Sequence, residues 1–139
     1  KVVAANGSGE INSALDWRGM DFLSGEAQDN FNNVCLVHGS STDYIEFQFN
    51  SPGGEQAPAG YHILVYCRKP TGAPAKIRLR IGGQIKTTQT INWTNYGWLD
   101  LWLGGIPKGL RTIRLENAES DSNICIGNDS WDRAISILY

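Results

Sequence analysis

The sequence has little charge and few of the residues on which reactive sites usually depend. Only 19% of its 139 residues are charged, the formal net charge is −2, and it contains two histidines and one methionine. Both signs of charge are mixed along the chain, so no basic patch or stripe indicates a nucleic-acid binder. No apolar run approaches the roughly eighteen residues of a membrane-spanning helix, and no signal-peptide pattern is visible. We therefore expect neither nucleic acid nor a membrane as a partner.

Recognisable catalytic motifs are also missing. His38 and His62 have no motif around them, and neither Gly-x-Ser-x-Gly nor His-Glu-x-x-His occurs. The paired carboxylates of glycosidases have no fixed spacing in a sequence, so the absence of a motif does not exclude glycoside hydrolysis. A chain this short shows no insertion that would build a deep cleft. We expect a domain that binds its target without acting on it chemically.

The three cysteines do not fit a fully paired framework or a zinc site. Cys35, Cys67 and Cys125 form no Cys-x-x-Cys, and their odd number excludes complete pairing within the chain. Each stands beside apolar residues, which favours three buried thiols that act as small hydrophobic side chains. One disulfide with one remaining thiol is the main alternative.

The residues that are plentiful indicate one folded domain of an extracellular type. Hydrophobic residues make up 41% of the chain, which also holds 16 glycines and five tryptophans. A chain of this length buries roughly two thirds of the surface that it exposes when unfolded, so residues 1–139 can fold as one domain without a covalent staple. Loops rich in glycine and asparagine, together with many tryptophans, are common in extracellular sugar-binding domains. We expect a secreted or extracellular monomer.

Alternation with a period of two residues dominates the chain, as it does in half-buried strands. Residues 43–49 place Ile45, Phe47 and Phe49 on one face. Residues 61–67 are largely apolar on both faces, which predicts a central strand covered on both sides. The other alternating segments are residues 76–81, 85–91, 98–103, 111–115 and 133–139.

Glycine- and proline-rich turns separate these segments. Gly82-Gly83 joins two of them and predicts a hairpin. We count about nine or ten strand candidates at the spacing typical of sandwiches, and no helical period of useful length. Residues 13–33 show the least clear pattern, which fits a short strand, a helical turn or loops. The sequence therefore predicts an all-β sandwich of two antiparallel sheets.

Six segments resemble, in order, the carbohydrate-binding modules of families 6 and 35. Thr-Asp-Tyr-Ile-Glu-Phe (42–47) is similar to their Gly-Asp-Trp-Ile-Glu-Tyr strand, and the segment 107–115 is similar to a later strand of the pattern pxGxxtIrL. The remaining four matches are residues 59–66, 77–83, 97–98 and 128–137. The resemblance implies a galactose-binding-like jelly roll, usually appended to a glycoside hydrolase or polysaccharide lyase.

The resemblance also implies a sugar site in the loops at one end of the sandwich. In the related modules an aromatic residue faces a tryptophan, and an asparagine hydrogen-bonds to sugar hydroxyls. The first position falls near His38, the second on Trp98 or Tyr96, and the third on Asn128. His38 departs from the family's aromatic, and Asn128 requires a two-residue insertion before the last strand.

The densest aromatic segment indicates the same region without reference to the family. Trp93, Tyr96 and Trp98 lie within six residues, with asparagine and glycine between them as in a loop. Flat aromatic rings stack on the apolar C–H faces of sugars, although at least one of the three could instead plug the end of the sandwich. Alternation with core-facing leucines places Trp102 on an outer face. Trp131, between aspartates, is a further ligand-binding candidate.

The related modules commonly hold a structural calcium ion. Its carboxylates come from an Ala-Glu-Asp segment in the first strand and from an aspartate of the last strand. Here Ala-Leu-Asp-Trp (14–17) supplies Asp16 but has leucine in place of the glutamate, and the last strand supplies Asp132. Calcium takes about six to eight oxygen ligands, so Glu10 or Glu26 could complete the set. The resemblance implies calcium as a structural cofactor.

The expected function is that of a non-catalytic module that binds a neutral or acidic polysaccharide. Such a module raises the local concentration of an attached enzyme on its substrate. A protein-interaction or adhesion domain of the same fold is the alternative from another class. A small polysaccharide-degrading enzyme is the third possibility.

Overall fold

Twelve strands and no helix make up the described part of the chain. The computed structural model describes residues 2–4, 16–18, 21–22, 34–36, 44–51, 61–70, 72–118, 122–127, 129–130 and 135–138. The strands are β1 (Val2–Ala4), β2 (Asp16–Arg18), β3 (Asp21–Phe22), β4 (Val34–Leu36), β5 (Tyr44–Ser51), β6 (Tyr61–Arg68), β7 (Ala75–Ile81), β8 (Gln84–Ile91), β9 (Gly97–Gly104), β10 (Gly109–Asn117), β11 (Ile124–Ile126) and β12 (Ile135–Leu138). These residues include no helix long and apolar enough to cross a membrane.

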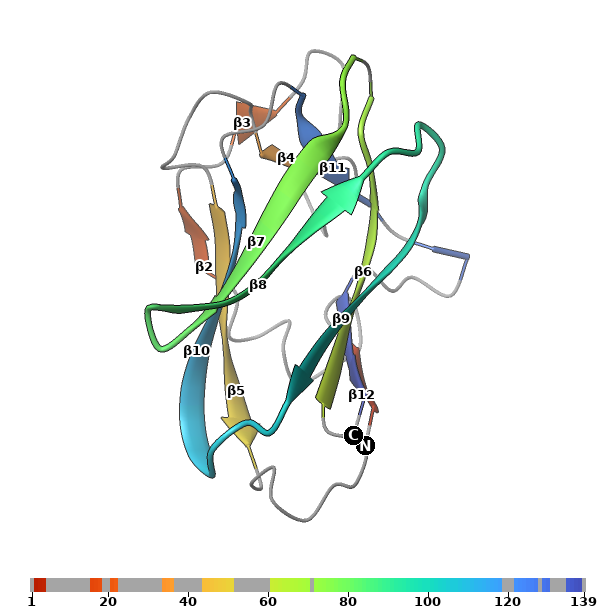
Figure 1. The fold of residues 1–139 in the computed structure, drawn as a ribbon. Coiled ribbons are helices and arrows are strands. Elements are labelled where there is room, and N and C mark those ends of the chain that lie inside the picture. Colours follow the sequence, from red (N-terminus) through yellow and green to blue (C-terminus); the bar gives the residue numbers. More distant parts are fainter. Residues whose placement is uncertain are drawn as a thin grey trace.

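The strands form two antiparallel sheets that pack face to face (Figure 1). One sheet has five strands in the order β2-β5-β10-β7-β8, and the other has seven in the order β1-β12-β6-β11-β4-β3, with β9 paired to β6. Strand β9 pairs with β6 from Tyr61 to Cys67, so β12 and β11 share the other edge of β6 one after the other. The predicted all-β sandwich is therefore confirmed, with β6 at the centre of its sheet.

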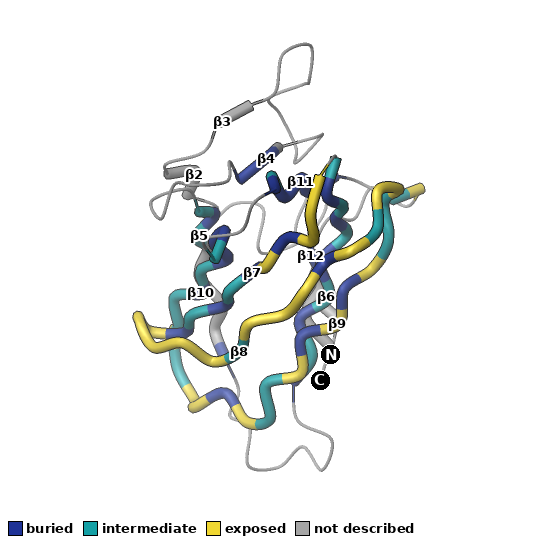
Figure 2. The backbone as a smooth tube through the Cα atoms, turned by 45° about the horizontal axis from the view of Figure 1, so that its top comes forward, coloured by how far each residue is buried: buried dark blue, intermediate teal, exposed yellow. Residues whose placement is uncertain are grey.

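Alternating apolar residues from both sheets form the core between them. Figure 2 shows buried positions alternating with less buried ones along the strands. The period of two predicts this arrangement, because successive side chains of a strand point to opposite faces. The core residues of the long strands β6, β7, β9 and β10 include Ile63, Val65, Ile77, Leu79, Leu99, Leu101, Ile113 and Leu115. On β6 only every second residue is fully buried, and the others are half-buried. The prediction that both faces of this strand are covered is thus correct for one face only.

The hairpin between β7 and β8 turns at Gly82 and Gly83, as the sequence predicts. Both glycines have positive φ, 58° and 83°, a conformation that residues with a Cβ rarely adopt. Strand β8 lies at the sheet edge, and all but Thr87 and Ile91 of its residues are exposed. Its run of polar threonine and glutamine side chains is compatible with that exposure.

A disulfide joins Cys35 and Cys125, which lie directly opposite each other on β4 and β11. Their Cα atoms are 4.0 Å apart, although 90 residues separate them in sequence. The prediction of three buried thiols is therefore wrong for these two cysteines, because pairing of β4 with β11 brings them together. It is correct for Cys67, whose burial raises the pKa of its thiol to about 12. At neutral pH this thiol stays protonated and inert.

Candidate functional site

Strands β6 and β9 present a row of aromatic and polar side chains on the outer face of the seven-stranded sheet. Leu99 and Leu101 point into the core, so the alternate residues of β9 point outward. Pairing of the two strands sets Trp98 opposite Tyr66, and Trp102 opposite His62. We call this surface the aromatic face, and its residues are His62, Tyr66, Arg68, Tyr96, Trp98, Asp100 and Trp102.

Tyr66 is the centre of the aromatic cluster. Its ring stacks on Tyr96 with the centroids 5.2 Å apart and the planes at 14°. It also contacts Trp98, with centroids 5.1 Å apart and a tilt of 51°. The guanidinium of Arg68 lies 5.1 Å from the centroid of the Tyr96 ring, at cation–π distance. The rings therefore support one another and form a preorganised surface.

Gly127 fixes the position of Tyr96 by its lack of a side chain. A Cβ atom at Gly127 would lie only 2.6 Å from Cζ of Tyr96, so the ring rests directly on the backbone. The amide of Gly127 donates a hydrogen bond of 3.1 Å to the carbonyl of Tyr66, which ties the two segments together. Neither Tyr66 nor Gly127 is among the site residues predicted from the sequence, because no motif around either one marks it.

Trp93 belongs to the end of the core more than to the aromatic face. It is half-buried against the core cluster, and its indole Nε1 donates a 2.7 Å hydrogen bond to the carbonyl of Cys67. A Cβ atom at Gly97 would lie 3.4 Å from the same indole nitrogen. This geometry favours the reading in which one of the three loop aromatics plugs the sandwich.

Trp98 and Trp102 carry the exposed surface of the aromatic face. Their exposed fractions are 37% and 61%, which confirms that Trp102 lies on an outer face. Four residues of an antiparallel strand span about 14 Å, so the two rings lie further apart than one sugar unit reaches. Asp100 lies between them on β9, and its Oδ1 forms a 2.7 Å hydrogen bond with Nδ1 of His62, which stands opposite Trp102 on β6. This pair supplies polar groups in the middle of an apolar row.

The other predicted site residues cannot be placed beside these. His38, Asn128, Trp131 and Asp132 lie outside the described residues, and only the backbone of Asp16, in β2, is described. Within the part of the chain that the structure describes, no group of three or more His, Cys, Asp or Glu side chains could hold a metal ion. The predicted calcium ligands therefore remain a prediction from the sequence.

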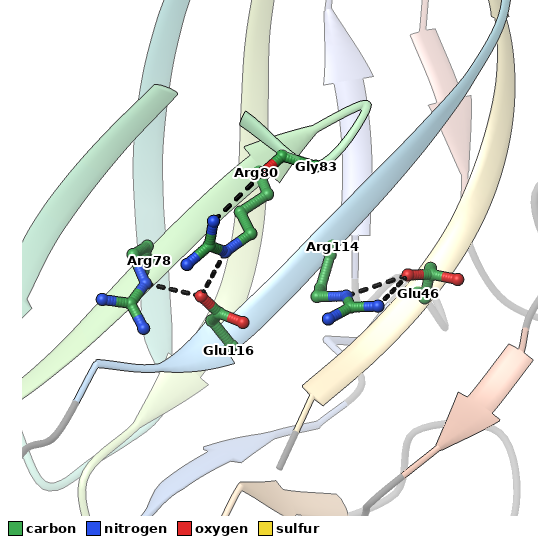
Figure 3. A network of polar contacts seen from close by, with 6 residues as sticks. All are labelled: Glu46, Arg78, Arg80, Gly83, Arg114 and Glu116. Carbon is green, nitrogen blue, oxygen red and sulfur yellow. Dashed lines mark hydrogen bonds and ion pairs between the residues drawn. The ribbon is translucent and has the colours of Figure 1, made fainter. Parts of the chain in front are cut away.

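The opposite sheet carries a second polar feature, a cavity of about 420 Å³. Its lining residues come from β5, β7, β10 and the β7–β8 turn, and they are Glu46, Arg78, Arg80, Gly83, Thr112, Arg114 and Glu116. Oε1 of Glu116 accepts hydrogen bonds from Nε of Arg78 at 2.5 Å and Nε of Arg80 at 2.6 Å (Figure 3). Arg114 pairs with Glu46 at 2.8 Å and lies 3.9 Å from the centroid of the Tyr44 ring.

Glu116 is the most buried member of this network, with an exposed fraction of 3%. Burial alone would raise the pKa of its carboxyl, but the hydrogen bonds and positive charges of Arg80 and Arg78 outweigh burial and lower the pKa. The carboxylate is therefore ionised at neutral pH.

The solved structures with the same fold include carbohydrate-binding modules. The CBM36-1 domain of a multidomain xylanase from the hindgut metagenome of Trinervitermes trinervoides superposes with a TM-score of 0.68 at 16% identity, covering 100% of this chain and 96% of that chain. A family 36 module in complex with calcium and xylotriose gives 0.60 at 16% identity, covering 99% of this chain and 98% of that chain. A family 35 module from Clostridium thermocellum gives 0.57 at 17% identity, with coverages of 99% and 98%.

These similarities concern the fold. No protein-family model and no curated protein sequence matches the chain. The structural matches extend over essentially its whole length, and they show the jelly-roll sandwich of carbohydrate-binding modules. The jelly-roll fold implied by the resemblance to families 6 and 35 is thus confirmed.

Proposed function

We propose that the chain is a non-catalytic carbohydrate-binding module that binds a polysaccharide or oligosaccharide through the aromatic face. The observation that carries this proposal is the exposure of Trp98 and Trp102 on one strand face, supported by the ring of Tyr66, which contacts Trp98 and stacks on Tyr96. Sugar rings have apolar C–H faces edged by hydroxyls, so they bind to flat aromatic side chains that have oriented polar partners nearby.

The polar partners lie where a stacked sugar chain would need them. Asp100 stands between the two tryptophans, His62 lies opposite Trp102 and contacts Asp100, and Arg68 lies beside Tyr96 at the other end of the row. An imidazole and a carboxylate offer both donors and acceptors to sugar hydroxyls. Because four residues of backbone, about 14 Å, separate Trp98 from Trp102 along β9, a ligand that contacts both must contain several sugar units. The aromatic face therefore suits an internal stretch of a chain better than a single end unit.

The neighbouring structures support a role beside a catalytic domain. One neighbour is a domain of a multidomain xylanase, and another binds xylotriose. A module linked to a glycoside hydrolase or lyase would raise the effective concentration of that enzyme on its polysaccharide. The disulfide between Cys35 and Cys125 supports a secreted or extracellular location, because disulfides persist in oxidising environments. We propose a monomer that needs neither nucleic acid nor a membrane.

A structural calcium ion belongs to the proposal as well. A family 36 neighbour is in complex with calcium, and the sequence offers Asp16 and Asp132 as ligands. Carboxylates are suitable ligands for this ion. The aromatic face as described contains the single carboxylate of Asp100, so we assign calcium no part in binding there.

A degradative enzyme is disfavoured by the state of the two cavity carboxylates. A glycosidase needs one carboxylic acid with a raised pKa as proton donor. Glu116 has a lowered pKa, and Glu46 is paired with Arg114. Glu116 is therefore not suited to donate a proton at neutral pH, and Glu46 is held in its ion pair with Arg114.

Affinity gel electrophoresis against a panel of polysaccharides tests the proposal. Trp98→Ala and Trp102→Ala should each weaken binding by about thirtyfold, the factor that corresponds to the ~2 kcal/mol of an interface hot spot. Leu110→Ala is the matched control, because Leu110 is 62% exposed and lies on the other sheet. Equal retardation of all three variants and the wild type would reject the aromatic face as the binding surface. Tyr96→Ala is less informative, since that ring also packs on Gly127.

A further inference from the structure

Asp100 contributes the one carboxylate of the aromatic face. It occupies the middle of the outward-facing row of β9, with Trp98 two residues before it and Trp102 two residues after it. Its side chain is 58% exposed, so it is accessible to a molecule that lies along the row. A ligand that contacts both tryptophans must therefore pass over this carboxylate.

The contact with His62 orients the carboxylate and leaves acceptor groups for a ligand. Oδ1 of Asp100 lies 2.7 Å from Nδ1 of His62, and Oδ2 forms no hydrogen bond with a described residue. When the imidazole is neutral, Nδ1 donates its hydrogen to Oδ1, and the pair keeps one negative charge. Oδ2 of Asp100 can then accept hydrogen bonds from sugar hydroxyls.

The negative charge of Asp100 is not balanced by a cation of the described chain. Among these residues Asp100 forms no ion pair with a lysine or an arginine. Asp100 lies opposite Leu64 on β6, and Arg68 follows Leu64 by four residues, which is about 14 Å of strand. Exposed charges more than about 8 Å apart are largely screened at physiological ionic strength. The aromatic face therefore has a positive charge at the Tyr96 end and a negative charge in its middle.

We infer that Asp100 determines the specificity of the aromatic face, which accepts neutral sugar chains and excludes polyuronates, whose every unit carries a carboxylate. This selectivity rests on the proposed function, because it concerns the ligand of the same face. A neutral unit above Asp100 donates its hydroxyls to the carboxylate in charge-assisted hydrogen bonds. A uronate unit in the same place brings a second negative charge to within about 5 Å, where repulsion weakens binding by about tenfold.

Isothermal titration calorimetry with matched hexasaccharides tests this selectivity. The neutral probes are xylohexaose, cellohexaose and mannohexaose, and the charged probes are hexaglucuronate and hexamannuronate with the same linkage between units. The wild type should bind at least one neutral probe, about tenfold or more tightly than the charged probe of matching ring configuration.

Three variants separate the charge of Asp100 from its shape and from the net charge of the protein. Asp100→Asn keeps the size of the side chain and a hydrogen-bonding group for His62, so the preference for the neutral probe should fall to about twofold. Asp100→Glu keeps the charge and should keep the preference. Gln84→Lys is the matched control, because it raises the net charge by the same single unit at an exposed position of β8, in the other sheet. Its preference should equal that of the wild type.

The salt dependence gives a second readout, which a purely structural role of Asp100 would not produce. At about 1 M sodium chloride the charges are screened beyond about 3 Å, so the wild-type preference should shrink. A preference that stays the same at high salt would overturn the electrostatic inference.

The remaining outcomes distinguish failure of this selectivity from failure of the proposed function. Equal affinity of the wild type for a neutral probe and its charged counterpart would overturn the selectivity and leave the proposed function intact. An unchanged preference in Asp100→Asn would do the same, as would loss of the preference in Gln84→Lys. If Trp98→Ala bound the neutral probes as tightly as the wild type does, or if the wild type bound none of the probes, both the selectivity and the proposed function would be wrong.

Discussion

Removal of the Cys35–Cys125 disulfide should destabilise the fold more than any other single change to the described residues outside the central core. The bond closes a loop between residues 90 positions apart. A cross-link lowers the conformational entropy of the unfolded chain. For a loop of about 90 residues this loss stabilises the folded state by about 4–5 kcal/mol at 25 °C. Since domains of this size are stable by about 5–15 kcal/mol, the bond accounts for a large share of the total.

Urea unfolding of the wild type and a Cys35→Ala/Cys125→Ala variant measures this effect. The variant should lose about 4 kcal/mol of unfolding free energy, and a reductant should lower the wild-type midpoint while leaving the variant unchanged. Cys67 is an internal control, because its buried thiol forms no disulfide and should not respond to the reductant. The reasoning would be refuted by a wild-type midpoint that is the same with and without reductant, together with a variant within about 1 kcal/mol of the wild type.

Three further predictions concern the aromatic face, the charged network and calcium. Gly127→Ala should displace the Tyr96 ring, destabilise the fold by about 1–3 kcal/mol and weaken polysaccharide binding, as chemical denaturation and affinity gels would measure; full stability with unchanged affinity would contradict the packing. The folded pKa of Glu116 lies below its ordinary value of 4.5, so the stability that its ion pairs provide is fully present above that pH and is lost as the pH falls through the folded pKa. Melting temperatures measured across the acid range should fall as this stability is lost. Glu116→Gln should lower the melting temperature at neutral pH and make it depend less on pH in the acid range. The same acid dependence in the variant and the wild type would mean that other groups cause the loss. Millimolar calcium should raise the melting temperature above that measured in EDTA. Asp16→Ala and Asp132→Ala should abolish this difference. An unchanged melting temperature of the wild type would show that calcium is not a structural cofactor.

Much of the fold follows from the period-two alternation in the sequence. Because a strand has only two faces, the leucines of β9 determine on which side Trp98 and Trp102 must lie, and the structure confirms it. Gly82 and Gly83 likewise predict the hairpin, because they adopt positive φ without strain. These features are local, and local sequence is enough to predict them.

The features that the sequence does not reveal depend on contacts between distant segments. The disulfide requires β4 to pair with β11, and neither short strand indicates its partner. Tyr66 looks like one more apolar residue of a buried strand until β9 is placed beside it. The role of Gly127 becomes visible only once the Tyr96 ring lies on its backbone. Pairing order and register, which local patterns leave open, determine the composition of the aromatic face.

The most direct test of the central claim is a glycan array probed with the wild type, the Trp98→Ala/Trp102→Ala double variant and the Leu110→Ala control. The aromatic face predicts that the wild type and the control bind the same set of oligosaccharides, with longer chains bound more tightly than single units. It also predicts that the double variant binds none of the neutral oligosaccharides of that set. Retention of the full binding pattern by the double variant would contradict the account.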